Sequence, residues 1–252
     1  MESIFTLYES EVKALWGAGL SKTFAIDLTN NPRPGVITAD TLRPLFEGLN
    51  SDGWKKQVGS NWVWRDAVPK HVTESKEVVL EREITMLDTQ IWTCQMSTSS
   101  GVQPNGLNRR RAIDLVRFNG NDRYAFIELK ADSDNPLYAA FEILGYSLAY
   151  LQAKEQKWNG EGCHDVFTAK EIELTILGPT SWNKYKTRGG EERSFKFDWL
   201  AEDIAKALNV FAQGGPGFSM AFRQYEDAPA SSLSDYATGG GVVFAMRNKK
   251  QP

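Results

Sequence analysis

The feature that most constrains this chain is a tight turn between two strand-like segments. Residues 111–118 and 124–130 are rich in β-branched and aromatic side chains, and the sequence Asn-Gly-Asn-Asp (119–122) lies between them. Asn and Gly tolerate the left-handed backbone that a short hairpin turn requires. The two segments are therefore predicted to pair as an antiparallel hairpin.

The segments on either side of the hairpin predict an α/β fold. An amphipathic helix is expected over residues 74–90, followed by a strand over 92–99. After the hairpin, Pro136 predicts the start of a second helix, a strand is expected over 171–177, and Asp198 is expected to cap a last helix. The order helix, strand, strand, strand, helix, strand, helix is typical of a mixed central sheet flanked by helices.

We expect one folded core with an extension at each end. A chain of 252 residues has about the size of one large domain, and its 41% apolar and 24% charged residues are globular values. The core is expected over residues 73–212, with an N-terminal extension over 1–72 that packs on it. A C-terminal extension is expected over 213–252, with edge strands over 218–223 and 242–246.

Composition excludes several classes of protein. No apolar run approaches the ~20 residues of a membrane span, and the first twenty residues lack the apolar stretch of a signal peptide. Cys94 and Cys163 are too few and too far apart for a disulfide framework. His71 and His164 are the two histidines, which excludes a site that needs three. A reducing, cytoplasmic setting without membrane contact is expected.

Three charged residues occupy the apolar hairpin. Asp114 lies inside its first strand, and Glu128 and Lys130 lie near the end of its second. Charges seldom occupy such positions unless they are paired or bound to something. Because side chains alternate along a strand, Glu128 and Lys130 share a face. A turn of three residues (120–122) would set Asp114 opposite Glu128, whereas a turn of two or four residues would set it on the other face.

Two carboxylates on neighbouring strands form an oxygen-rich pocket suited to Mg²⁺ or Mn²⁺. Mg²⁺ takes one or two carboxylates and leaves its other positions to water and phosphate oxygens. We expect Asp114 and Glu128 to bind the ion, together with the backbone carbonyl of Leu129. Lys130 would then orient the attacking water and offset the charge that grows on the phosphate. A buried salt bridge at the end of the sheet is the alternative interpretation of the three residues.

The run Arg-Ala-Ile-Asp114, followed by Phe-Ile-Glu128-Leu-Lys130, resembles the signature of the PD-(D/E)XK nuclease superfamily, which includes many restriction endonucleases and RecB-type nucleases. Its members carry an Asp on one strand and Asp/Glu-x-Lys on the hairpin partner. The proline that often precedes the Asp is Ile113 here. The resemblance covers roughly residues 74–180. It implies a restriction-endonuclease-like αβββαβ core, a metal-dependent nuclease activity, and Mg²⁺ as cofactor, which Mn²⁺ can replace.

The resemblance also implies supporting residues on two helices. Members often place a glutamate of the preceding helix near the metal, which here would be Glu83, with Glu77 at the opposite edge of the apolar stripe; a solvent-facing Glu83 is the alternative. RecB-type members carry Q-x-x-x-Y on the helix after the lysine, where this chain has Glu142 and Tyr146. Glu142 would either add a third carboxylate or pair with Lys130 and lower its activity.

Two basic clusters flank the hairpin, one directly before it and one after the strand expected beside it. They consist of Arg109, Arg110, Arg111, Lys184, Lys186 and Arg188. Such clusters are typical of contacts with a phosphate backbone, although a net charge of −3 is mildly against a nucleic-acid partner.

The function predicted from these residues is that of a Mg²⁺-dependent endonuclease whose partner is nucleic acid, and we expect DNA. Restriction, phage defence and DNA repair are compatible uses. The two extensions would supply grip on the substrate or a homodimer surface. The alternative is a catalytically silent nucleic-acid-binding or protein-interaction module on the same fold.

Overall fold

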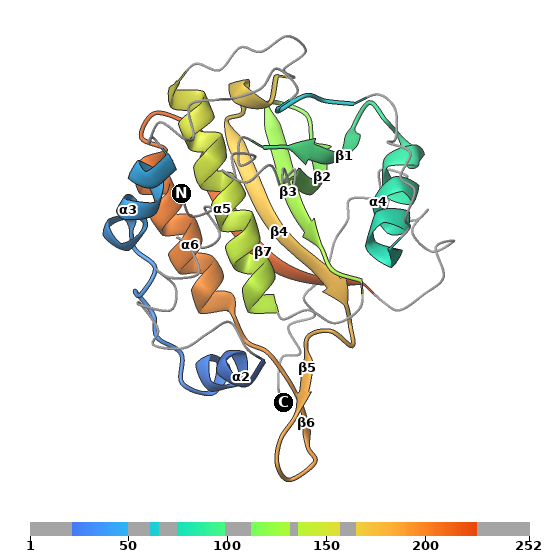
Figure 1. Cartoon of the computed structure of the whole chain (residues 1–252), viewed down its shortest axis with the longest axis vertical. Coiled ribbons are helices and arrows are strands. Elements are labelled where there is room, and N and C mark those ends of the chain that lie inside the picture. Colours follow the sequence, from blue (N-terminus) through green and yellow to red (C-terminus); the bar gives the residue numbers. More distant parts are fainter. Residues whose placement is uncertain are drawn as a thin grey trace, which may run out of the picture.

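The computed structural model describes residues 22–49, 61–65, 75–98, 112–131, 136–156 and 165–225. Within them lies a five-stranded sheet whose order is β1-β2-β3-β4-β7 (Figure 1). Its strands are β1 (Trp92–Ser97), β2 (Ala112–Phe118), β3 (Arg123–Leu129), β4 (Glu171–Pro179) and β7 (Gly217–Tyr225). The first three are antiparallel neighbours, whereas β3, β4 and β7 run parallel. The sheet is therefore mixed, as predicted.

The helices flank this sheet, and the predicted order of elements is confirmed. The helices are α2 (Lys22–Asn30), α3 (Ala39–Leu49), α4 (Lys76–Leu87), α5 (Pro136–Glu155) and α6 (Asp198–Phe211). From α4 onward the order is α4, β1, β2, β3, α5, β4, α6 and β7. A short 3₁₀ helix, η1 (Asp165–Thr168), and a separate two-stranded sheet of β5 (Lys184–Lys186) and β6 (Glu192–Ser194) are additions that the sequence did not predict.

The turn between β2 and β3 has the three residues that bring the charged side chains together. The Asn119 amide donates to the Arg123 carbonyl at 2.8 Å, and Gly120, Asn121 and Asp122 all have left-handed φ values of 77°, 52° and 58°. Leu115 consequently pairs with Ile127. The same register, continued by one step, sets Asp114 opposite Glu128.

Two apolar clusters hold the helices against the two faces of the sheet. The larger cluster joins α5 and α6 to one face, and α2 and α3 contribute Phe24, Leu28 and Leu42 to it. The smaller cluster joins Ile84 of α4 to Trp92 and other residues of the opposite face. The candidate site lies where these layers meet at one end of β2 and β3.

The structure corrects two predicted helix ends. Phe197, not Asp198, occupies the N-cap position of α6 and makes no side-chain capping bond; Asp198 lies in the first turn, where a carboxylate favours the helix dipole. The helix predicted to reach residue 90 ends at Leu87, because the Asp88 side chain accepts from the Gln90 amide at 2.9 Å. The expected strand 242–246 lies outside the described residues.

The boundaries proposed at residues 72 and 212 stay predictions. Within the described ranges, no helix combines the length and the apolar character needed to cross a membrane.

Candidate active site

Asp114, Glu128 and Lys130 gather at the end of the sheet where β2 begins and β3 ends. The Leu129 amide donates to Asp114 Oδ2 at 2.9 Å, which fixes that carboxylate across the hairpin. Glu128 and Lys130 are 3% and 6% exposed, and Asp114 is partly buried. The hairpin therefore brings all three predicted residues together in a largely dry environment.

The Lys130 ammonium is held between two carboxylates. Its Nζ donates to Glu128 Oε1 at 2.9 Å and to Glu142 Oε2 at 2.8 Å. Glu142 comes from α5, whose other residues between positions 136 and 153 are uncharged. Of the two roles left open for Glu142, the structure has the pairing with Lys130. Tyr146, one helical turn further along, is buried in the larger apolar cluster.

Helix α4 brings Glu81 to the site, rather than Glu83. Glu81 is 2% exposed, and Gln95 Nε2 donates to its Oε2 at 2.6 Å. Glu83 is exposed, because two residues along a helix turn a side chain to a different face. Glu77, four residues before Glu81 on the same face, accepts from the Ala131 amide at 3.1 Å.

Glu81 and Gln95 are the residues that the sequence did not reveal. The spacing of Glu77, Glu81 and Ile84 at helical intervals was the available signal for Glu81. Gln95 had none, since it reaches Glu81 from a strand position with a left-handed φ of 53°. A non-glycine residue in that conformation is strained by about 1–2 kcal/mol and is held there by its surroundings.

Crowding of carboxyl groups in this dry environment shifts their proton affinities upward. Burial raises the pKa of Asp114 to about 7, against the opposing effects of the Lys130 ammonium and the Leu129 amide. Burial, and then the charge of Asp114, raise the pKa of Glu81 to about 8. The same two causes raise the pKa of Glu128. Burial alone would lower the pKa of Lys130, but the charges of Glu128, Glu142 and Asp114 outweigh it and raise that pKa.

The residues present fit a hard divalent cation. Glu128 Oε2 is buried and has no hydrogen-bond partner among the described residues, so one oxygen of the site is left for a ligand. Among those residues, no three His, Cys, Asp or Glu side chains are arranged to hold a metal ion by themselves. Mg²⁺ needs one or two carboxylates and completes its shell with water and substrate oxygens. Asp114 and Glu128 could supply those two, and the Leu129 carbonyl stays a predicted third ligand.

Of the two predicted basic clusters, the described residues include one. Arg109, Arg110 and Arg111 lie outside the described residues. Lys184, Lys186 and Arg188 lie on and next to β5, after the strand that pairs with β3, as the sequence predicted. Lys184 Nζ is paired with Glu192 Oε1 at 2.7 Å.

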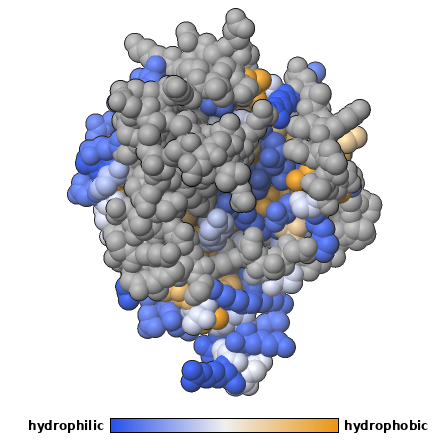
Figure 2. All heavy atoms as spheres, in the orientation of Figure 1, coloured by the Kyte–Doolittle hydropathy of each residue, from blue (hydrophilic) through white to orange (hydrophobic). Residues whose placement is uncertain are grey.

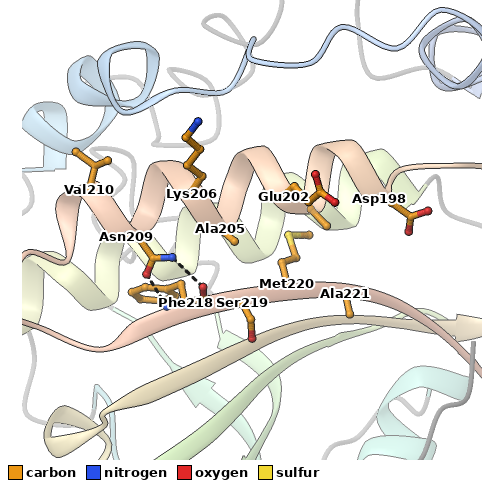
Figure 3. A pocket seen from close by; sticks show the side chains of 11 residues that line it. Asp198, Glu202, Ala205, Lys206, Asn209, Val210, Phe218, Ser219, Met220 and Ala221 are labelled. Carbon is orange, nitrogen blue, oxygen red and sulfur yellow. Dashed lines mark hydrogen bonds between the residues drawn. The ribbon is translucent and has the colours of Figure 1, made fainter.

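A separate groove of about 930 Å³ lies between α6 and β7 (Figure 3). Asn209 lies in it and donates from Nδ2 to the Phe218 carbonyl at 2.9 Å, while its Oδ1 accepts from the Phe218 amide at 2.7 Å. The charged side chains of this groove are those of Asp198, Glu202 and Lys206, and all three are exposed. The groove shares no lining residue with the candidate site.

Comparison of the chain with protein-family models, curated proteins and solved structures found no match. Any function assigned to the protein therefore rests on its own residues and their arrangement.

Proposed function

We propose that this protein is a metal-dependent nuclease with a restriction-endonuclease-like αβββαβ core. The observation that carries the proposal is the register of β2 and β3. In this register Asp114 lies opposite Glu128, and Lys130 lies beside them. An Asp and a Glu-x-Lys on paired strands are the residue types and the placement of the PD-(D/E)XK signature. A buried salt bridge alone is a weak explanation, since such pairs contribute little net stability.

The roles of the residues follow from their chemistry. Asp114 and Glu128 would hold Mg²⁺, which when bound supplies Lewis acidity toward a phosphodiester. Lys130 remains charged because carboxylates surround it. Its ammonium can orient a water molecule for attack on phosphorus and offset the charge that develops on the phosphate oxygens. Glu142 holds the ammonium from the side of α5.

The proposed reaction is hydrolysis of a phosphodiester bond in DNA. The water oxygen forms a bond to phosphorus, the bond from phosphorus to one ester oxygen breaks, and the leaving oxygen takes up a proton. Basic residues near the same end of the sheet support a nucleic-acid substrate. The choice of DNA comes from the resemblance.

Cleavage assays on plasmid and single-stranded DNA with Mg²⁺ or Mn²⁺ test the proposal. Asp114→Asn and Lys130→Met should each lower the rate by about a thousandfold, since each removes a group that acts on the developing charge. Glu83→Gln, an exposed residue of α4, is the matched control and should cleave normally. Absence of metal-dependent cleavage, or cleavage that persists undiminished in both site variants, contradicts the proposal.

One observation favours the alternative of a catalytically silent module. Glu128 and Glu142 together hold Lys130 at 2.9 and 2.8 Å, which ties up the ammonium that catalysis would use. A silent module would bind nucleic acid or a protein without cleaving DNA, and Glu142→Gln would then leave it silent. A nuclease whose lysine is only restrained by Glu142 would still cleave in that variant, with a changed rate.

A further inference from the structure

The β5–β6 hairpin projects from the body of the molecule (Figure 1), and Figure 2 shows its protruding end as mostly hydrophilic. It begins shortly after β4, whose carboxyl end lies beside that of β3, with Leu177 paired to Leu129. The hairpin therefore leaves the sheet at the edge that carries the candidate site. An element placed there is positioned to meet a substrate that reaches beyond the site.

Aromatic side chains anchor the base of this hairpin in the core. Tyr185, Phe195 and Phe197 are between 3% and 5% exposed, and the rings of Phe195 and Phe197 stack at 5.6 Å. The Tyr185 hydroxyl donates to Asn30 Oδ1 of α2 at 3.2 Å. At the other end of the hairpin, the Thr187 amide donates to the Glu191 carbonyl at 2.9 Å. The hairpin is thus a supported arm rather than a loose loop.

The exposed surface of the arm carries an excess of positive charge. Both of its carboxylates are already paired, Glu192 with Lys184 at 2.7 Å and Glu191 with Arg193 at 2.9 Å. Three exposed cations of the arm form no ion pair or hydrogen bond in the described part of the chain, although the charge of Lys186 also acts on Glu192. They are Lys186, Arg188 and Lys196. These three are available for an anionic partner.

The arm presents no aromatic ring for stacking. Its aromatic residues are buried, and its exposed residues are charged or polar apart from two glycines of the turn. Proteins that bind single-stranded nucleic acid combine charge with exposed rings on which bases stack. Contacts to a duplex need no such rings, because phosphates supply most of the affinity and a two-stranded ribbon fits the major groove.

We propose that the β5–β6 hairpin is an arm that holds double-stranded DNA beside the candidate site, with Lys186, Arg188 and Lys196 contacting phosphates. The proposal rests on the proposed nuclease function for its choice of DNA. It names the duplex as the substrate, and it excludes Lys184 from the principal contacts because Glu192 neutralises that residue.

Binding of a short fluorescent DNA duplex and of its single strand, measured in EDTA over a range of salt concentrations, tests the arm without requiring cleavage. The wild type should prefer the duplex. The double variant Lys186→Ala/Arg188→Ala should bind the duplex at least about tenfold more weakly. Its slope of log affinity against log salt should be smaller by about two, since each phosphate contact contributes about 0.9.

The control is Arg123→Ala/Lys206→Ala, which removes two exposed positive charges, one at the start of β3, the end far from the candidate site, and one on α6. It should bind the duplex within about twofold of the wild type, since distant exposed charges are screened at these salt concentrations. Equal thermal melting of both double variants and the wild type would show that folding is unaffected.

Three outcomes would contradict the proposal that the hairpin binds duplex DNA. They are equal duplex binding by the two double variants, equal loss of duplex and single-strand binding in the hairpin variant, and no DNA binding by the wild type. The nuclease proposal can fail separately. If the arm variant loses duplex binding while Asp114→Asn cleaves DNA like the wild type, the results support the arm as a DNA-binding element and contradict the assigned active site.

Discussion

The candidate site and the groove between α6 and β7 are two differently built regions of the same molecule. The groove is a hollow of about 930 Å³ whose charged side chains are exposed to solvent. The candidate site is marked instead by the burial of its charged side chains, since Glu81, Glu128 and Lys130 are each less than 7% exposed. Solvent can stabilise the charges of the groove, whereas the charges of the site depend on one another.

The comparison shows why we assign the proposed chemistry to the buried charges rather than to the hollow. A hollow needs only a gap in packing, and in this one the Asn209 side chain links α6 to β7 through two hydrogen bonds. A set of buried carboxylates around one lysine opposes folding and calls for a further explanation. The five predictions below test whether the two regions differ in this way.

The largest difference in the free energy of unfolding is expected between two lysine variants, one in each region. Lys130→Met should lower the free energy of unfolding by about 3 kcal/mol, because it leaves the buried Glu128 and the partly buried Glu142 without their cation. Lys206→Met, in the groove, should change it by less than about 0.5 kcal/mol. Urea denaturation of both variants measures the difference. Equal stabilities would show that the buried ion pairs contribute nothing.

A substitution in the groove should lower the stability of the protein and leave DNA cleavage unchanged. Asn209→Ala removes two hydrogen bonds to the Phe218 backbone, at 2.9 and 2.7 Å, and should lower the free energy of unfolding by about 2 kcal/mol, roughly 1 for each. DNA cleavage by the folded variant should be unchanged. Loss of cleavage at a temperature where this variant is fully folded would instead make the groove part of the active region.

The site should make stability depend on pH. Folding raises the pKa of Asp114 to about 7 and that of Glu81 to about 8. Between about pH 4 and pH 8 the folded protein therefore holds protons that the unfolded chain has released, so stability falls as pH rises through this range. In EDTA the melting temperature should decrease over that range, by about 2–4 °C for each kcal/mol of stability that is lost.

Divalent cations should reverse this pH effect, since a bound ion replaces the protons. At pH 8, Mn²⁺ should raise the melting temperature of the wild type but not that of Asp114→Asn. A variant of the groove, Asp198→Asn, is the control and should respond to Mn²⁺ like the wild type. A metal response that survives in Asp114→Asn would place the ion elsewhere.

The smallest change in stability is expected from two matched variants of α4, one at a buried glutamate and one at an exposed glutamate. Glu81→Gln should raise the free energy of unfolding by about 1 kcal/mol at pH 8, because the amide removes a buried charge next to Asp114 and can still bond to Gln95. Glu83→Gln should change it by less than about 0.5 kcal/mol, since that side chain is exposed. Thermal melting at pH 8 and at pH 5 distinguishes them, and the advantage of Glu81→Gln should disappear at pH 5.

Local chemistry made the hairpin predictable, whereas its register depended on a turn length that the sequence left open. The residues at positions 120–122 adopt the left-handed conformations that their types favour, and the count of three then fixes Asp114 opposite Glu128. The strand order around the hairpin followed from the periodicity of apolar residues. Both features depend on neighbours in the sequence, which a single chain reveals.

The features that the sequence did not predict depend on long-range packing. Whether Glu81 or Glu83 faces the site depends on how α4 rotates against the sheet, and the periodicity of the helix leaves that angle open. The β5–β6 hairpin went unpredicted because Lys184–Lys186 and Glu192–Ser194 carry one apolar residue, Tyr185, between them. Its strands are stabilised by aromatic residues that the core buries at its base.

The contact between Tyr225 and the loop after β3 has a consequence for synthesis of the protein. The Tyr225 hydroxyl donates to the Lys130 carbonyl at 3.3 Å, so the last residue of the final described strand helps to fix the backbone at Lys130. A ribosome must therefore release almost the whole described chain before that lysine is fully anchored. Under the proposed function, this order of synthesis would delay DNA cleavage until β7 has emerged.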